Sequence, residues 1–376
     1  MTDKFRLTLA QLNPTVGALE ANAAKARAAW AEGKAAGADM VALPEMFITG
    51  YQTRDLIMKR AFHADATAAL EQLALDCANG PALAIGGPWW DGARLYNAYW
   101  VMERGKVVAR VLKHHLPNDT VFDEVRQFAP ADVGGPYRIG PVRIGSPICE
   151  DAWFDDVTET LAETGAEIIL VPNGSPYYRN KYDRRVGLMV ARVIETKLPL
   201  VYLNLVGGQD DQVFDGGSFV LNPGIELAMQ MPVFDEAVAH VDFERHSGGW
   251  RARRTDVVPL PDEWEQDYHA LVLALRDYMG KSGIGKVLLG LSGGIDSALV
   301  AVIASDALGP QNVRCVMLPS EYTAQHSLDD AAAVARRLGC RLDTVPIEGP
   351  RSAVGTALAP LFAGMRPWIA EENIQS

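Results

Sequence analysis

Short apolar runs alternate with longer segments of helical periodicity along most of this chain. Residues 5–11 alternate apolar and polar positions as a strand does, and the alanine-rich segment from about 18 to 36 is typical of a helix. The same periods predict helices at 64–77, from 154 and at 182–197, and buried strands at 39–43, 82–86, 142–148, 167–171 and 200–204. This alternation predicts an α/β fold.

Two apolar runs, 95–102 and 107–112, flank Gly105-Lys106 and predict a hairpin. The polar segment that follows, from His114 to about Gly135, is longer than a usual connection, so we expect a functional loop there. Strands near 213–221, 225–230 and 237–242 are expected to complete this part of the fold.

A change in composition predicts two domains. Residues from about 245 to 261 are rich in Arg, Gly and Pro, as in a linker. Beyond them, strands near 286–291, 313–318 and 342–347 alternate with helices, which predicts a parallel, doubly wound Rossmann-like sheet. We therefore expect a first domain at 1–245, a linker at 246–264 and a second domain at 265–376.

Composition narrows the class of protein. The 376 residues suffice for about two domains, and the formal net charge of −12 argues against a nucleic-acid partner. Four dispersed cysteines without a C-x-x-C pair disfavour a zinc site or a disulfide framework. Without a signal-peptide pattern or a run of 18 apolar residues, we expect a cytoplasmic protein with no membrane partner.

One glycine-rich stretch follows a predicted strand and leads into a predicted buried helix at 298–304. Backbone N–H groups in such a loop bind phosphate oxygens, and Ser297 is a plausible N-cap. The Walker-like segment 280–286 is rejected because Val287 stands where Ser or Thr would bind magnesium. The predicted phosphate loop consists of Gly290, Leu291, Ser292, Gly293, Gly294, Ile295, Asp296 and Ser297.

This loop resembles the Ser-Gly-Gly-x-Asp-Ser signature of the ATP pyrophosphatases, enzymes that adenylate a substrate and release pyrophosphate. The resemblance implies ATP as a co-substrate, with Mg²⁺ as activator and no tightly bound cofactor.

Three residues of the first domain occupy one topological position, each just after a predicted strand: Glu45, Lys113 and Cys149. Ligands gather at the carboxyl ends of strands in such folds. The predicted helix after Cys149, and a nearby Lys, would lower the thiol pKa from its usual ~8.5. Together the three side chains supply a base, an oxyanion stabiliser and a nucleophile, although each also fits a structural role: a core thiol, a cap and a surface cation.

The words around these residues resemble the signatures of the nitrilase (carbon–nitrogen hydrolase) superfamily: Leu-Pro-Glu45-Met, Leu-Lys113-His-His-Leu-Pro and Ile-Cys149-Glu-Asp-Ala-Trp. The resemblance covers about residues 5–245 and implies an αββα sandwich with a Glu-Lys-Cys catalytic triad. We expect His114 and His115 to be structural, because no carboxylate or further His falls at ligand spacing. No metal site is therefore expected.

A nitrilase-like domain followed by an ATP-pyrophosphatase loop resembles the family of glutamine-dependent NAD synthetases. That resemblance implies ammonia release from glutamine and amidation of adenylated deamido-NAD. It also implies a homo-oligomer. It assigns Ser175, Lys181, Tyr51 and Glu124 to a glutamine pocket. Asp119 stands where the family usually has Tyr near that pocket, and Asn373 matches a segment that contacts deamido-NAD.

Family synthetase domains continue well past the length present here. The sequence therefore predicts a fragment of a longer protein, or a synthetase half without activity. Two alternatives stay open at this point: a stand-alone amidase or nitrilase with an incomplete ATP-binding tail, and a non-catalytic module that docks on a complete partner.

Overall fold

The computed structural model describes residues 4–364. The chain forms two compact units, Met1–Ala270 and Leu271–Ser376, and the division falls within helix α6 (Glu263–Lys281). Within residues 4–364, no helix combines the length and the apolar character needed to cross a membrane.

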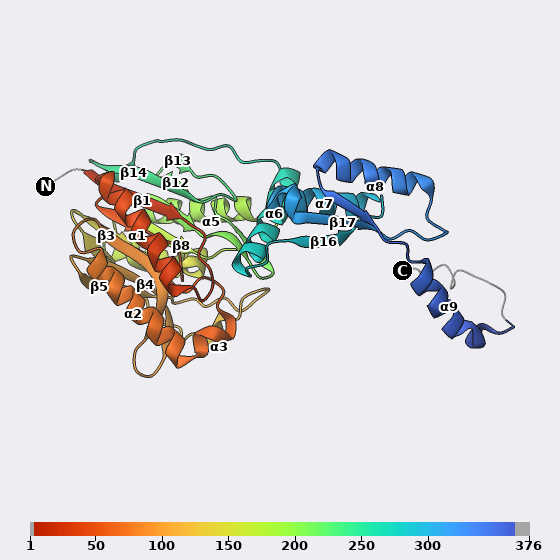
Figure 1. Cartoon of the computed structure of the whole chain (residues 1–376). Helices are drawn as coiled ribbons and strands as arrows, with labels where there is room; N and C mark the ends of the chain where they lie inside the picture. The colour runs from red at the N-terminus through yellow and green to blue at the C-terminus, as the bar shows by residue number, and fades with distance from the viewer. Residues whose placement is uncertain (1–3, 365–376) are drawn as a thin grey trace. The chain divides into compact units, whose positions relative to one another are not determined.

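Two large sheets build the first unit (Figure 1). The seven-stranded sheet has the order β15-β14-β1-β2-β3-β4-β5. Its strands are β1 (Lys4–Gln11), β2 (Met40–Ala42), β3 (Ala82–Trp90), β4 (Leu95–Glu103), β5 (Lys106–Leu112), β14 (Ala237–His246) and β15 (Gly249–Ala252). The six-stranded sheet has the order β13-β12-β9-β8-β7-β6. Its strands are β6 (Tyr137–Ile139), β7 (Val142–Gly145), β8 (Ile168–Asn173), β9 (Leu200–Asn204), β12 (Phe219–Asn222) and β13 (Glu226–Gln230).

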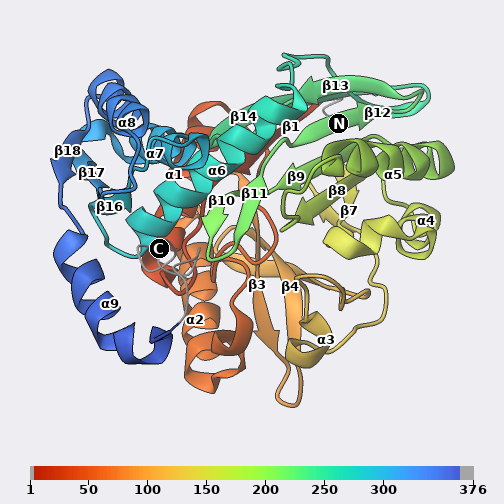
Figure 2. The ribbon, with the colours of Figure 1, turned by 90° about the vertical axis from the view of Figure 1, so that its right-hand side faces the viewer.

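Helices cover the outer face of each sheet, α1 and α2 on the first and α4 and α5 on the second (Figure 2). These four helices are α1 (Leu19–Ala35), α2 (Arg60–Asp76), α4 (Asp155–Glu163) and α5 (Lys181–Thr196). The unit also contains the two-stranded ribbon of β10 (Val206–Gln209) and β11 (Gln212–Asp215), the short helix α3 (Glu124–Gln127), and the 3-10 helices η1 (Arg54–Met58) and η2 (Cys149–Trp153).

Strand alternation explains the layers. In β8, Ile168 and Leu170 face the core between the two sheets, whereas Ile169 and Val171 face the core beneath α4 and α5. A strand that buries both faces appears in the sequence as a short continuous apolar run, and it was this run, without alternation, that located β8. The αββα sandwich that the family resemblance implied is confirmed.

Two segments of the first unit differ from the expectation. The single strand expected at 213–221 is two strands, because Gly216 and Gly217 turn the chain with φ of 65° and 62° from β11 into β12, in another sheet. The range expected to be a linker contains β15, which pairs with β14 and buries Trp250.

The second unit holds a three-stranded parallel sheet, β16-β17-β18, and its helices. Its elements are β16 (Val287–Gly290), α7 (Ile295–Leu308), η3 (Pro310–Asn312), β17 (Val313–Met317), α8 (Gln325–Leu338), β18 (Arg341–Thr344) and α9 (Glu348–Phe362). Parallel strands alternating with helices confirm the Rossmann-like class.

Helix α7 corrects two details. It begins at Ile295 with Gly294 as its N-cap, so Ser297 lies in the first turn and is not the cap. The helix expected to be buried buries one face only: Ala301 and Ala304 are in the core, while Leu299 and Val300 are about half exposed. An apolar sequence without periodicity does not identify the face that packs.

Candidate active site

Glu45 lies in the loop after β2 and is fully buried. One carboxylate oxygen, Oε1, accepts hydrogen bonds from the Lys113 ammonium and the Asn97 amide, both at 2.7 Å. The other oxygen accepts the backbone N–H of Gly174 at 2.8 Å. Three other segments of the chain thus fix the orientation of this carboxylate.

Lys113 directly follows β5 and is also buried. Its ammonium lies 2.7 Å from Glu45 and 2.8 Å from Glu124. Burial alone would lower the pKa of Lys113, but the charges of Glu124 and Glu45 outweigh it and raise the pKa well above its usual value. This lysine is therefore a permanent cation between two carboxylates.

Glu124 begins α3 in the long polar loop that was expected to be functional. Its Oε1 accepts from the Tyr51 hydroxyl at 2.7 Å and from the Asn97 amide at 3.1 Å. Burial raises the pKa of Glu124, and the Lys113 ammonium opposes that shift. The structure thus brings both Tyr51 and Glu124 into contact with the groups around Lys113.

Cys149 is the first residue of η2, with 3% of its surface exposed and a left-handed φ of 50°. The expectation of a lowered thiol pKa is wrong. Burial and the Glu45 carboxylate raise the pKa of Cys149 well above its usual value, and the Lys113 ammonium opposes this only in part. The positive charge of Lys113 is already offset by the carboxylates of Glu45 and Glu124. Cys149 is therefore a thiol at rest, and a base must remove its proton before the sulfur can act as a nucleophile.

Asp151 joins the segment of Cys149 to the segment of Lys113. Its carboxylate accepts the backbone N–H of Ile148 at 2.9 Å, of His114 at 3.0 Å and of His115 at 2.7 Å. Burial raises the pKa of Asp151 to about 6 against the lowering effect of these hydrogen bonds. These three hydrogen bonds fix the backbone next to Cys149 relative to the backbone next to Lys113.

The other residues assigned to a glutamine pocket lie around this cluster. Ser175 is buried, and its hydroxyl accepts a hydrogen bond from the Arg185 guanidinium at 3.3 Å. The Lys181 ammonium lies 4.5 Å from the centre of the Trp153 ring and 4.4 Å from that of Tyr178. Burial lowers the pKa of Lys181.

Asp119 lies on the exposed part of the loop between β5 and α3. It is close enough to Glu150 for its charge to raise the pKa of that carboxyl, next to a larger effect of burial. Glu150 immediately follows Cys149, so Asp119 adds negative charge on the side of the nucleophile.

Several residues of the site were not found in the sequence. Asn97 is a buried amide among the largely apolar and aromatic residues 95–102 of β4, and a polar residue out of pattern is the signal that points to it. A Cβ on Gly86 would lie 2.1 Å from the backbone nitrogen of Met46, so only glycine allows β3 to approach the Glu45 loop. Asp151 lies within the signature segment around Cys149, but no role for its side chain could be inferred from the sequence.

The glycine-rich loop of the second unit has the expected strand–loop–helix setting. Ser292 and Ser297 hydroxyls lie 3.0 Å apart, and the Ser297 hydroxyl donates to the Gly294 carbonyl at 3.0 Å. Gly293 has φ of 86°, and a Cβ there would lie 2.1 Å from the Ser327 carbonyl oxygen.

A cavity of ≈ 240 Å³ opens beside this loop. Its lining comes from the end of β16 and the loop after it, from the end of β17 and the segment that follows, and from the first turn of α8: Gly290, Leu291, Ser292, Val316, Met317, Leu318, Pro319, Thr323 and Leu328. Asn373, expected to contact deamido-NAD, lies outside the described residues.

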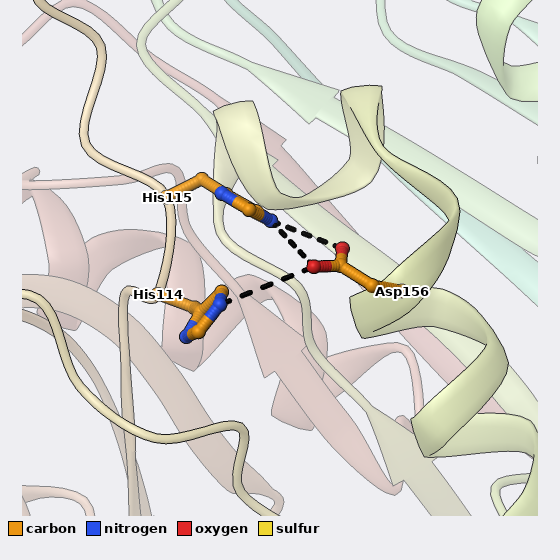
Figure 3. A group of neighbouring side chains, drawn as sticks. All are labelled: His114, His115 and Asp156. Carbon is orange, nitrogen blue, oxygen red and sulfur yellow. Dashed lines mark hydrogen bonds and ion pairs between the residues drawn. The ribbon is translucent and has the colours of Figure 1, made fainter.

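One expectation about histidines is wrong. No carboxylate was expected near His114 and His115, but Asp156 at the start of α4 lies against both (Figure 3). The contact was missed because 41 residues separate Asp156 from His115 and only the fold brings them together.

Comparisons with known proteins find two different families in successive parts of the chain. The family model for carbon-nitrogen hydrolase matches residues 6–251, and that for NAD synthase matches residues 267–376. The glutamine-dependent NAD(+) synthetase of Rhodobacter capsulatus is 64% identical over 376 residues, covering 100% of this chain and 68% of that protein.

Solved structures show the same relationship. Glutamine-dependent NAD+ synthetase from Acinetobacter baumannii, in complex with adenosine diphosphate, has a TM-score of 0.92 and 34% identity, covering 99% of this chain and 70% of that one. An amidase from Nesterenkonia sp. has a TM-score of 0.57 and 24% identity, covering 64% of this chain and 90% of that one, which shows a shared fold alone. This chain belongs to the family of glutamine-dependent NAD(+) synthetases, ligases that form an amide with glutamine as the nitrogen donor.

Proposed function

We propose that Glu45, Lys113 and Cys149 hydrolyse the side-chain amide of glutamine, and that the loop at residues 290–297 binds the ATP that activates the acceptor of the released ammonia. The observation that carries the first half is a buried lysine that is 2.7 Å from one carboxylate and 2.8 Å from another, beside a buried cysteine. Burying three charges is costly for a fold, so a purely structural role explains this arrangement poorly.

The reaction begins with proton transfer from the Cys149 thiol to the Glu45 carboxylate as sulfur attacks the amide carbon. Negative charge develops on the amide oxygen, and the fixed Lys113 ammonium stabilises it. The C–N bond then breaks, the proton passes from Glu45 to the leaving nitrogen, and ammonia departs from a thioester. Water, deprotonated by Glu45, hydrolyses the thioester to glutamate and restores the thiol.

Recognition of glutamine is assigned to the residues around this cluster. Lys181 supplies a cation for the α-carboxylate, with Ser175 as a neighbouring hydroxyl. Asp119, together with Glu150, supplies negative charge for the α-ammonium group. Tyr51 and Glu124, joined by a hydrogen bond of 2.7 Å, form one wall of the pocket.

The second unit is assigned the amidation step. ATP adenylates the nicotinate carboxylate of deamido-NAD with loss of pyrophosphate, and ammonia then displaces AMP to give NAD. The glycine-rich loop, with Asn373, is assigned to these substrates. The Acinetobacter baumannii relative was solved in complex with adenosine diphosphate, which supports nucleotide binding by this family. The Asp296 carboxylate and the Ser292 and Ser297 hydroxyls are oxygen donors of the kind that Mg²⁺ prefers, so they fit a phosphate-bound magnesium ion that would neutralise phosphate charge.

Two further assignments belong to the same proposal: a cytoplasmic location and assembly as a homo-oligomer. Both rest on the family relationship.

The test supplies glutamine, deamido-NAD, ATP and magnesium, and measures glutamate and NAD separately. Cys149→Ala should lower glutamate formation by about 1000-fold or more. Cys77→Ala removes another buried thiol of the same unit and should leave glutamate formation unchanged. Glutamate formation that survives in Cys149→Ala would overturn the assignment.

A further inference from the structure

Beside the glutaminase residues lies a second group of side chains that the proposed reaction does not use: His114, His115 and Asp156 (Figure 3). One ligand atom from each lies within 4.8 Å of the other two. Nε2 of His115 is 2.9 Å and 3.0 Å from the two carboxylate oxygens of Asp156, and Nε2 of His114 is 4.0 Å from one of them. Both rings therefore face the same carboxylate.

The tautomer of His114 suits a ligand. Its Nδ1 is 2.6 Å from the carbonyl oxygen of Ala131, and a carbonyl can only accept, so Nδ1 carries the hydrogen. Nε2 of neutral His114 then has a free lone pair directed at Asp156. Metal-binding histidines commonly donate their other ring N–H to a carbonyl in this way, which fixes the ring.

The backbone of the cluster is fixed as well. The Asp151 carboxylate accepts the N–H groups of both His114 and His115, at 3.0 Å and 2.7 Å. The His115 ring also packs on Phe154, with ring centres 4.3 Å apart. Two imidazoles and one carboxylate are thus held on a preformed support.

We propose that His114, His115 and Asp156 bind one divalent transition-metal ion of the zinc class, with a fourth position open to water. In a tetrahedral zinc site, ligand atoms at ~2.0–2.2 Å from the metal lie about 3.3–3.5 Å from one another. The N–O separations of 2.9 Å and 4.0 Å lie on either side of that value, and all three ligand atoms lie within 4.8 Å of one another. Two imidazole ligands favour Zn²⁺, Co²⁺ or Ni²⁺ over Mg²⁺ or Ca²⁺.

A simple ion pair between His115 and Asp156 accounts for less. It explains the 2.9 Å contact, but not why Nε2 of His114 faces the same oxygen at 4.0 Å, beyond hydrogen-bond length. A metal between them uses all three groups. It would also tie the segment that follows Lys113 to the start of α4, so its binding stabilises the first unit.

The test adds Zn²⁺ or Co²⁺ to the chelator-treated chain of 376 residues. It measures stoichiometry by calorimetry, cobalt coordination by visible absorption, and the shift in Tm. We expect one equivalent to bind with a raised Tm, and Mg²⁺ at the same concentration to have no such effect. His114→Gln and Asp156→Asn should each weaken binding at least tenfold. Circular dichroism checks that these variants fold, and the cobalt spectrum reports the ligands independently of stability.

Two control variants locate the ion. His246→Gln removes an exposed imidazole of the same unit and should leave binding unchanged. Cys149→Ala removes the thiol that could compete for zinc and should also retain binding. Loss of binding in Cys149→Ala, or unchanged binding in His114→Gln and Asp156→Asn, would overturn the proposal, as would no binding at all.

Discussion

Lys113 lies buried between Glu45 and Glu124, with its ammonium 2.7 Å and 2.8 Å from their carboxylates. The Asn97 amide donates to both carboxylates, and the Tyr51 hydroxyl donates to Glu124. At the residue scale, the site is therefore one hydrogen-bonded charge network in which each member depends on the others. This interdependence makes single substitutions informative.

Lys113→Met should destabilise the first unit by about 3–5 kcal/mol, because it leaves two carboxylates buried without a counter-charge. Lys25→Met is the matched control: its partner Glu236 is 2.6 Å away and both side chains are over 40% exposed, so a cost of about 1 kcal/mol or less is expected. Urea unfolding followed by tryptophan fluorescence measures both. Equal losses would show that the network contributes no more than a surface pair.

The pKa of Cys149 provides a pH test. Burial and the negative charge of Glu45 both raise this pKa, so the thiolate forms at a higher pH than an ordinary cysteine thiolate does. Glu45→Gln removes the negative charge and leaves Lys113 less neutralised, and each change lowers the thiol pKa. The midpoint of Cys149 alkylation by iodoacetamide should therefore move to lower pH.

The control for this measurement is Glu20→Gln, which removes an exposed carboxylate of α1. Its alkylation midpoint should match the parent. A midpoint that stays in place or rises in Glu45→Gln would mean that Glu45 does not act on the thiol.

Sequence reasoning at this scale identified residue types better than their environments. Glu45, Lys113 and Cys149 each follow a strand, and the structure places Glu45 and Lys113 in direct contact. The predicted sign of the Cys149 pKa shift was wrong, because burial and the Glu45 carboxylate raise this pKa, and neither the burial nor the position of Glu45 can be read from the residues next to Cys149. Asn97 was missed because its partners Glu45 and Glu124 are distant in sequence, and Asp151 because two of its partners, His114 and His115, are distant as well.

At the scale of elements, close backbone approach positions the site. Gly86→Ala should displace the Glu45 loop, since the added Cβ would lie 2.1 Å from the Met46 nitrogen, and overpacking of this kind costs about 1–3 kcal/mol. We expect a marked loss of glutamate formation along with lower stability.

Gly187→Ala in α5 is the matched control, because the added methyl group has space there. Its Cβ would meet no described atom within 4 Å outside its own helix, so stability should rise by about 0.5–1 kcal/mol with glutamate formation unchanged. Thermal unfolding and the glutamate assay, run on both variants, separate the two mechanisms. Full activity in Gly86→Ala would contradict the role given to this approach.

The phosphate loop allows a similar comparison. Gly293→Ala combines a left-handed φ of 86° with a Cβ 2.1 Å from the Ser327 carbonyl, so it should weaken nucleotide binding at least tenfold. Gly285→Ala lies outside the loop, just before β16; its methyl group meets no described atom within 4 Å, and it should bind as the parent does. Calorimetric titration with ATP and magnesium measures both, and equal affinities would remove the loop from the nucleotide site.

Helices and strands were predicted correctly from the sequence where a strand buries both faces or a long helix buries one face. Prediction failed where tertiary contacts decide. Gly216 and Gly217 divide one apolar run between two sheets, and β15 pairs with β14 inside a segment whose composition resembles a linker. Helix α7 is apolar on most sides, so its sequence did not show which face packs.

At the scale of the whole molecule, the chain combines two compact units with different chemistry. Unfolding is therefore not expected to be a single two-state transition. Seven of the eight tryptophans precede residue 271, so tryptophan fluorescence reports mainly the glutaminase unit. Stability changes at Lys113 and Gly86 are for that reason assigned to the first unit.

The central claim is that glutamine is cleaved through a thioester on Cys149. Acid quenching of the parent during turnover with glutamine, followed by peptide mass spectrometry, tests it most directly. We predict a γ-glutamyl adduct on the peptide that contains Cys149, absent from Cys149→Ala and retained in Cys77→Ala. Glutamate formation at the parental rate by Cys149→Ala, with no adduct on the parent, would contradict the account.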